Sequence, residues 1–319
     1  MFLGALGAML AAASAGAAVM AHGGRFSAGL DILTHWAPVY LVGAILGALL
    51  AACGVGPNRR AGLTLAAVGG LAAAALMAPE FLRDAGPTAP PGAPGEIKVI
   101  QFNVWRDNRH REQVVAWLKA ENPDVLLVEE ASPGLRNLIV ARTGWRVAGA
   151  QSSDMIFTHA PYLAMQRPRL SGDSRLTWVN ATYDIGGGPL EVMVTNTGWP
   201  TTLDLVPQGK VLRRVVSQLP RERMILGGDF NSTPWSFRRQ HDDARLGLIR
   251  RDRALATWPT GRTGLWPWAA PIPIFPIDHV YAGPGWATTS VRRGPRLGSD
   301  HYPLIVTLAP VAPPAASPR

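Results

Sequence analysis

Cysteine is almost missing from this sequence, because its 319 residues contain only Cys53. No disulfide framework therefore supports the fold, and the core has to be held by burial of apolar side chains. Internal repeats are also missing. The lysines and arginines form no periodic stripe interleaved with aromatic residues, so the sequence does not define an obvious nucleic-acid groove.

Charged residues are missing from three long apolar stretches near the N-terminus, at residues 2–21, about 36–56 and 61–78. Each is close to the roughly 20 apolar residues that cross a bilayer as a helix. Soluble helices rarely lack a polar face, so residues 1–82 are predicted to form a transmembrane region. The stretches hold no polar residues of the kind that line a transport pathway, which sets aside a transporter or channel.

The short loops predict the orientation of these spans. The loop PNRR between the second and third spans carries Arg59 and Arg60, whereas His22–His35 carries Arg25 against Asp31. Lys and Arg tend to stay cytoplasmic, so the chain after about residue 82 is expected on the extracytoplasmic, periplasmic side of the cell (inner) membrane. The first span could instead be a cleaved signal peptide, although its start lacks positive charge. Cleavage would leave the remainder on the same side.

A Pro/Gly-rich linker is predicted at residues 83–95, which include AGPTAPPGAPG. Residues 96–309 then mix strand and helix patterns, and residues 310–319 are expected to be a disordered tail. So many strands are best buried as an α/β (α+β) two-sheet sandwich. Strands are predicted at 97–102, 124–128, 154–158, 176–184, 190–196, 224–228, 278–282 and 304–308, and helices at 112–120, 211–218 and 237–245.

Positive charge is concentrated in this second part of the chain. Residues 1–90 hold four of the 31 Lys/Arg and three of the 22 Asp/Glu, which leaves a net charge of +8 on the rest. Such an excess favours polyanions or an anionic membrane surface.

The stretch ILGGDFNSTPWS, residues 225–236, combines an apolar strand with polar residues. Gly227-Gly228 is interpreted as a breaker where only small residues fit. Alternation then places Asp229 and Asn231 on one side and Phe230 in the core. A simple turn cap is the alternative use of Asp229.

Other polar residues also adjoin apolar runs, where a sheet presents side chains at its edge. They are Asn103, Glu130, Asp278, Asp300 and His301. Carboxylate and amide oxygens suit a hard cation such as Mg²⁺, and a histidine with a carboxylate neighbour could move a proton or stabilise a phosphoryl oxygen.

Five segments in this order, IQFNVW, PDVLLVEE, GGDFNSTP, IDHVY and GSDHYP, resemble the motifs of the endonuclease/exonuclease/phosphatase (DNase I-like) superfamily. Membrane-tethered bacterial members look similar. The resemblance implies a DNase I-like sandwich and metal-assisted hydrolysis of a phosphoester with Mg²⁺ or Mn²⁺.

The resemblance also implies residue roles. The expected metal ligands are Glu130, Asp300 and Asn103, and Asn103 also contacts phosphate. The expected catalytic residues are Asp229 for the attacking water, Asn231 for its orientation, His301, and Asp278 to orient His301. Glu129 and His279 are expected to point away from the site.

One position departs from the family pattern: VMVTNTGWP has Asn196 where many members have a histidine. The Asn196 amide can donate a hydrogen bond to phosphate, but it cannot act as an acid near neutral pH. A catalytically weak or inactive membrane-anchored scaffold on the same fold therefore stays open beside the enzyme.

The substrate also stays open between a nucleic acid and a phospholipid-like ester. Four aromatic residues precede Asp278 in a proline-rich loop that could pack on the sheet, stack bases or enter the bilayer interface. They are Trp258, Trp266, Trp268 and Phe275.

Overall fold

The computed structural model describes residues 2–167, 176–185, 187–201, 205–261 and 272–311. The chain divides into two compact units. The first consists of Met1–Arg83 and Ser232–Ala244, and the second of Asp84–Asn231 and Arg245–Arg319.

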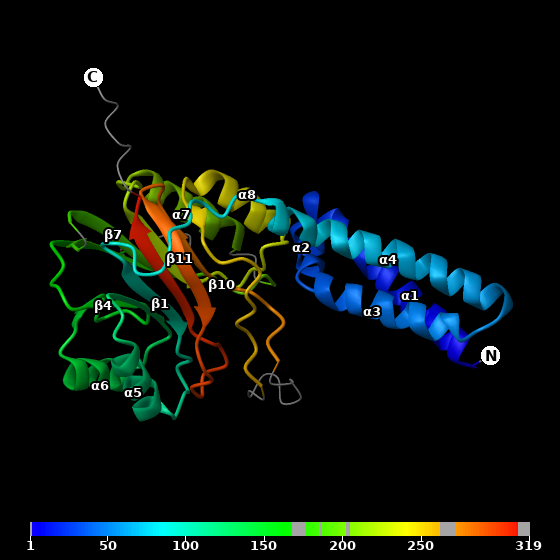
Figure 1. Ribbon diagram of the computed structural model, residues 1–319, viewed down its shortest axis with the longest axis horizontal. Coiled ribbons are helices and arrows are strands. Elements are labelled where there is room, and N and C mark those ends of the chain that lie inside the picture. Colours follow the sequence, from blue (N-terminus) through cyan, green and yellow to red (C-terminus); the bar gives the residue numbers. More distant parts are fainter. Residues whose placement is uncertain (1, 168–175, 186, 202–204, 262–271, 312–319) are drawn as a thin grey trace, which may run out of the picture. The chain divides into compact units, whose positions relative to one another are not determined.

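The first unit is helical. It contains α1 (Phe2–Ala21), the 3-10 helix η1 (His22–Arg25), α2 (Ala28–Thr34), α3 (Ala37–Ala52) and α4 (Gly56–Leu82). Helices α1, α3 and α4 pack against one another (Figure 1). The three expected spans lie on these helices, although α4 continues through Pro79 instead of ending near it. A short helix, α2, occupies the expected first loop.

Two helical segments, Phe2–Arg25 and Gly56–Leu82, are long and apolar enough to cross a membrane. The pair α2 and α3 passes the same test as one segment bent by 55°, which makes up to three. Small residues let these helices approach closely, because a Cβ added to Gly7 would lie 2.3 Å from the Ala51 nitrogen. This is the packing expected of helices in lipid, so the first unit is compatible with a membrane anchor.

The second unit contains two mixed six-stranded sheets, which confirms the predicted sandwich. The first has the order β11 (Trp286–Arg293), β12 (Leu304–Pro310), β1 (Ile97–Asn103), β2 (Val125–Glu129), β4 (Met155–Thr158), β3 (Arg146–Ala148). The second has the order β5 (Ala164–Gln166), β6 (Thr177–Asp184), β7 (Pro189–Asn196), β8 (Met224–Asp229), β10 (Asp278–Ala282), β9 (Ile249–Arg250).

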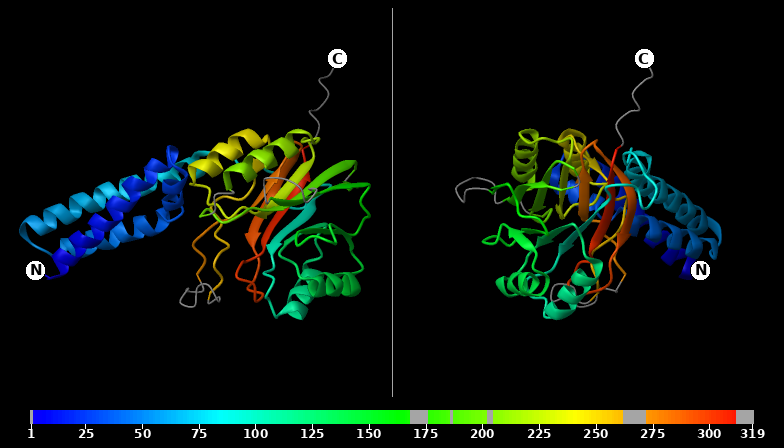
Figure 2. Two further views of the ribbon diagram at one scale, coloured as in Figure 1. Left: turned by 180° about the vertical axis from the view of Figure 1, so that it is seen from behind. Right: turned by 60° about the vertical axis from the view of Figure 1, so that its left-hand side comes forward.

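Helices cover the outer faces of both sheets. Helices α5 (Arg111–Glu121) and α6 (Pro133–Thr143) lie side by side along the first sheet (Figures 1 and 2). Helix α7 (Leu205–Ser217) packs on the second sheet through Leu212 and Val216. A further helix, α8 (Phe237–Leu246), begins in the first unit and ends in the second.

Strands buried on both faces explain the continuous apolar runs. In β2, Leu127 packs between the two sheets, whereas Leu126 packs under the outer helices. Both side chains are fully buried. Such a strand reads as an unbroken apolar run, which is why its position was predictable.

Gly227 and Gly228 lie within β8, so the expectation of a breaker is wrong. A Cβ on Gly228 would lie 1.8 Å from the Thr195 carbonyl oxygen, and one on Gly227 would lie 2.5 Å from Leu127 Cδ1. The part of the expectation that holds is the need for small residues, because neighbouring backbone and the facing sheet leave no room for a side chain.

The predicted linker makes contacts within the second unit. Thr88 lies in a parallel bridge with Thr288, and the Ala89 nitrogen donates to the Thr288 carbonyl oxygen at 3.0 Å. At the other end of the chain, Pro310 belongs to β12, and residues 312–319 of the predicted tail lie outside the described residues.

Candidate active site

Strand ends gather the predicted site residues at one edge of the sandwich. In the parallel pair β1 and β2, Asn103 lies opposite Glu129. In the parallel pair β7 and β8, Asn196 lies opposite Asp229, and the antiparallel strand β10 places Asp278 opposite Asp229 as well. The ends of β2 and β8 and the start of β10 therefore supply Glu129, Asp229 and Asp278 to the same edge of the sandwich.

His301 is the centre of this group. Its Nδ1 is 2.7 Å from Asp278 Oδ2, and its Nε2 is 3.7 Å from Asp229 Oδ2. Thr257 Oγ1 also donates to Asp278 Oδ2 at 2.5 Å. The imidazole is buried and lies between two carboxylates, so its orientation is fixed. The expected contact between Asp278 and His301 is present.

Two asparagine amides hold the Asp229 carboxylate. Asn103 Nδ2 donates to Asp229 Oδ2 at 3.1 Å and to Glu130 Oε1 at 3.0 Å. The Asn231 backbone nitrogen donates to Asp229 Oδ1 at 2.8 Å, and its Nδ2 donates to the Thr197 carbonyl oxygen at the same distance. The structure therefore joins Glu130 to Asp229 through Asn103. Phe230 points into the core, as predicted.

Glu129 does not point away from the site as alternation suggested. It is fully buried and accepts from Gln101 Nε2 at 3.0 Å, and the same nitrogen donates to Asp278 Oδ1 at 2.8 Å. Alternation assumes an extended backbone, but Glu130 has φ of 56° and leaves the strand geometry. Gln101, two residues before Asn103 on the same strand face, was the available signal for this second layer.

Positive φ values cluster around these strand ends. Besides Glu130, the non-glycine residues Trp105 and Asn231 have φ of 56° and 46°. Such conformations are uncommon for side chains with a Cβ and persist where the surroundings impose them. Trp105 is fixed by its nitrogen, which donates to Asn103 Oδ1 at 3.0 Å.

Asp300 lies beside a cluster of aromatic side chains that contains two predicted residues, Trp258 and Phe275, and one that was not predicted, Trp199. Trp258 Nε1 donates to Asp300 Oδ2 at 3.2 Å. Trp258 and Phe275 are buried against each other with ring centroids 5.6 Å apart, so these two pack on the fold. Trp199, which is 43% exposed, stands edge-on to Trp258 at 5.8 Å. Two other expected residues, Trp266 and Trp268, lie outside the described residues.

Burial and mutual repulsion perturb the carboxyl groups. Burial raises the pKa of Asp229 to about 8 against the opposing effect of His301, and it also raises the pKa of Asp300. Burial and the nearby Asp278 raise the pKa of Glu129 well above its usual range. For His301, burial lowers the pKa but the Asp278 and Asp229 carboxylates outweigh it, and the result is about 10. The site therefore crowds several buried acidic groups, whose charged forms are disfavoured, around one imidazolium.

Two sets of residues in this site offer oxygen or nitrogen ligands to a cation. Among the described residues, the one group of three acidic or histidine side chains with ligand atoms within 4.8 Å of one another is Asp229, Asp278 and His301. In that group the imidazole already lies against both carboxylates. In the predicted set, Glu130 and Asp300 offer carboxylate oxygens, which suit Mg²⁺ or Mn²⁺. Asn103 directs its Nδ2 toward Glu130 and Asp229, and its Oδ1 accepts from the Trp105 nitrogen.

His279 follows Asp278 but faces the opposite side of β10, as predicted. Its Nδ1 lies 2.8 Å from Asp252 Oδ2, and Asp252 Oδ1 accepts from the Val280 nitrogen at 3.0 Å. Arg250 Nη1 lies 3.6 Å from the same Asp252 carboxylate. Burial raises the pKa of Asp252, but the His279 and Arg250 charges outweigh it and the pKa falls to about 2. This buried ion pair supports the strand that carries Asp278.

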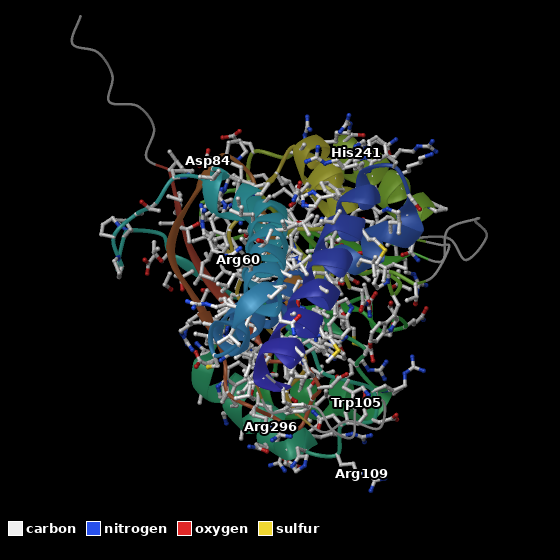
Figure 3. The ribbon with its side chains drawn as sticks, turned by 90° about the vertical axis from the view of Figure 1, so that its right-hand side faces the viewer. Arg60, Asp84, Trp105, Arg109, His241 and Arg296 are labelled. Atoms are coloured by element: carbon white, nitrogen blue, oxygen red, sulfur yellow. The ribbon has the colours of Figure 1, made fainter. Side chains whose placement is uncertain are left out.

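Basic residues follow and precede the site in the chain. Arg109 comes six residues after Asn103, is exposed and extends away from the ribbon (Figure 3). Arg296 comes four residues before Asp300 and is also exposed. The two segments are tied together, because Asn108 Nδ2 donates to the Leu297 carbonyl oxygen at 3.0 Å.

A two-sheet sandwich with carboxylates, amides and one histidine at an edge defines the DNase I-like class of fold. The chain belongs to the endonuclease/exonuclease/phosphatase family, whose pattern matches residues 100–301. The chain is therefore a member of a family of phosphoester hydrolases. In sequence, no curated protein matches it.

Solved structures agree on the fold. TDP2 of D. rerio, complexed with a single strand DNA product, is similar with a TM-score of 0.55 and 14% identity, over 67% of this chain and 99% of that chain. A mannosyl-6-phosphatase of Bacteroides thetaiotaomicron has a TM-score of 0.53 and 14% identity over 67% and 99%. An endonuclease/exonuclease/phosphatase from Beutenbergia cavernae is similar with a TM-score of 0.53 and 20% identity, over 69% of this chain and 73% of that chain.

Proposed function

We propose that this protein is a membrane-anchored, divalent-metal-dependent phosphoester hydrolase of the phosphodiesterase or nuclease type. The observation that carries the proposal is the buried His301 held between Asp278 and Asp229, with Asn103 and Asn231 fixing Asp229. A scaffold without activity has no need for this arrangement of otherwise costly buried polar groups.

We propose Glu130, Asp300 and Asn103 as the residues that would hold Mg²⁺ or Mn²⁺. When bound, such an ion polarises a phosphoryl oxygen and stabilises charge on the leaving group. The alternative group around His301 is less suitable, because the imidazole Nδ1 is already engaged by Asp278 at 2.7 Å.

The chain's own residues divide the remaining work. Asp229 positions and deprotonates the attacking water, and Asn231 keeps the Asp229 carboxylate in place through its backbone N–H. His301 donates a hydrogen bond to a phosphoryl oxygen through Nε2, while Asp278 fixes the ring through Nδ1. Asn103 and Asn196 donate to phosphate oxygens. Because Asn196 cannot protonate a leaving group, the favoured esters are those with good leaving groups.

We further propose that the first unit places the enzyme in the cell (inner) membrane as a multi-pass protein. Arg59 and Arg60, at the start of α4, favour a cytoplasmic position for that loop (Arg60 is labelled in Figure 3). The hydrolase domain then lies on the periplasmic side. The bilayer is its one inferred partner besides the substrate.

The substrate is a nucleic acid or a phospholipid-like phosphoester. The exposed Trp199 beside Trp258 and the exposed Arg109 and Arg296 suit a phosphoester that carries a planar or apolar group. The similar TDP2 structure holds single-stranded DNA, which favours testing a nucleic acid first.

The proposal is tested with the full-length protein in mild detergent. Hydrolysis of bis-p-nitrophenyl phosphate, single-stranded DNA and phospholipid vesicles is measured with Mg²⁺ or Mn²⁺, beside His301→Ala and the exposed-carboxylate control Asp184→Asn. We expect turnover that falls at least about 100-fold in His301→Ala and not in the control. No turnover of any ester by the folded protein would favour the alternative, a membrane-anchored scaffold.

A further inference from the structure

The short helix α2 supplies a cap to a segment that follows the site in sequence. Asp31 is buried, and its Oδ1 accepts from the Phe237 nitrogen at 2.9 Å. Its Oδ2 accepts from Ser236 Oγ at 2.8 Å and from the Arg238 nitrogen at 3.2 Å. The Phe237 and Arg238 nitrogens belong to the first backbone N–H groups of α8, which have no acceptor within their own helix. A carboxylate there also complements the positive end of the helix dipole.

His35, four residues later, holds the turn that leads into α8. Its Nδ1 lies 2.9 Å from Thr233 Oγ1 and accepts from the Thr233 nitrogen at 3.2 Å. Trp235 Nε1 donates to the His35 carbonyl oxygen at 3.2 Å. Thr233 is fully buried, and Trp235 and His35 are nearly so. Buried hydrogen bonds of this kind are costly to break on one side only.

The third contact is aromatic. Phe237 lies beneath the Arg25 guanidinium at 5.0 Å, and its ring centroid is 6.3 Å from that of His22. Gly24 is required here, because a Cβ would come within 3.0 Å of the Phe237 ring and 2.8 Å of the Asp31 Cα. The segment Ser232–Ala244 is thus folded into the helical unit by a polar cluster and a packed ring.

Ser232 follows Asn231 directly in the chain, so this contact begins one residue after the site. Asn231 has a constrained φ of 46° and donates to Asp229. A mere tether would need only the Pro/Gly segment 83–95, which is covalently sufficient to keep the domain at a membrane. The specific buried contacts of α2 need a different explanation.

We propose that α2 is a positioning element of the hydrolytic site: Asp31 and His35 hold Ser232–Arg238 within the helical unit independently of the segment 83–95, and thereby fix the main chain at the adjoining Asn231. The part of this proposal that concerns rate rests on the proposed function. Asp31 and His35 are positioning residues, because they act through the chain and not on the substrate.

The first test cuts the chain. A protease site is inserted between the exposed Pro91 and Gly92 of the full-length protein, which is cleaved in mild detergent and examined by size exclusion. We expect the two fragments to co-migrate after cleavage and to separate in Asp31→Ala/His35→Ala, whereas Asp184→Ala keeps them together. Separation of the native fragments, or co-migration in the double variant, would overturn the proposal. This readout needs no activity, so it is decided even if the protein hydrolyses nothing.

The second test uses uncut protein and steady-state kinetics on bis-p-nitrophenyl phosphate. Asp31→Ala is expected to lower kcat on the order of tenfold with little change in KM, because Asn231 is displaced while the phosphate contacts remain. Asp31→Asn should recover part of kcat, since it keeps one of the two oxygens that accept from the start of α8. Hydrogen exchange should rise at 232–238 and stay unchanged in β1 and β2. A uniform rise in exchange, or an unchanged kcat with faster exchange, would show a purely structural role and refute the positioning of the site.

Discussion

Replacing Asp252 by Asn should destabilise the second unit by a predictable amount. Asp252 is fully buried, and its pKa is lowered from 3.8 to about 2 because His279 and Arg250 outweigh the effect of burial. At about 1.36 kcal/mol per pKa unit, this difference corresponds to about 2 kcal/mol of stability. The amide keeps the size of the side chain and one of its two acceptor oxygens, so the substitution removes the charge together with one hydrogen-bond acceptor.

The pH dependence gives the sign of this effect. A carboxyl group whose pKa is lower in the folded state stabilises the fold fully above its unfolded pKa, near 3.8, and loses this contribution as pH falls to about 2. The difference between native protein and Asp252→Asn should therefore be constant above about pH 5. It should shrink between about pH 4 and pH 2.

The assay is urea unfolding of full-length protein in detergent, followed by tryptophan fluorescence. Asp184→Asn, on the exposed end of β6, is the control and should unfold like the native protein. Equal stability of Asp252→Asn and native protein at pH 7 would refute the reasoning. So would a difference that grows as the pH falls from 4 to 2.

Three further outcomes follow from single contacts. Gly228→Ala should lower the free energy of unfolding in urea by at least about 1–3 kcal/mol, because its Cβ would lie 1.8 Å from the Thr195 carbonyl oxygen. Gly16→Ala is the control and should cost far less, because an added Cβ there meets no atom within 4 Å. Similar losses of stability in the two variants would contradict the packing argument. Asn196→His should raise kcat at least about tenfold on alkyl phosphodiesters and little on p-nitrophenyl esters, since only the former need a proton on the leaving group; an equal effect on both would exclude that role. Trp199→Ala should raise KM for single-stranded DNA by an amount equivalent to about 1–3 kcal/mol and leave KM for p-nitrophenyl esters unchanged. An unchanged KM for DNA would show that Trp199 stacks no base.

The sequence predicted those parts of the fold that depend on buried strands. Leu126 and Leu127 pack on opposite faces of β2, and this burial gives an apolar run that identifies the strand without its neighbours. The same holds for Ile225 and Leu226 of β8. In contrast, β11 was missed because Trp286–Arg293 buries few of its side chains and so lacks a clear pattern.

The site was predictable where it follows directly from a strand end. Asp229, Asp278 and His301 come together as expected, but Glu129 and Gln101 form a second layer that alternation did not reveal, because Glu130 adopts a positive φ. The α2 contact had no local signal at all. Asp31 and Ser236 are separated by 205 positions, and neither has a neighbouring motif.

Metal dependence tests the central claim most directly. Full-length protein is stripped with EDTA, and hydrolysis of bis-p-nitrophenyl phosphate is measured during titration with Mg²⁺ for the native protein, Glu130→Gln and Asp184→Asn. We predict that chelation abolishes turnover, that Mg²⁺ restores it, and that Glu130→Gln alone needs at least about tenfold more Mg²⁺. Turnover that survives chelation, or a Glu130→Gln titration identical to that of Asp184→Asn, would contradict the account.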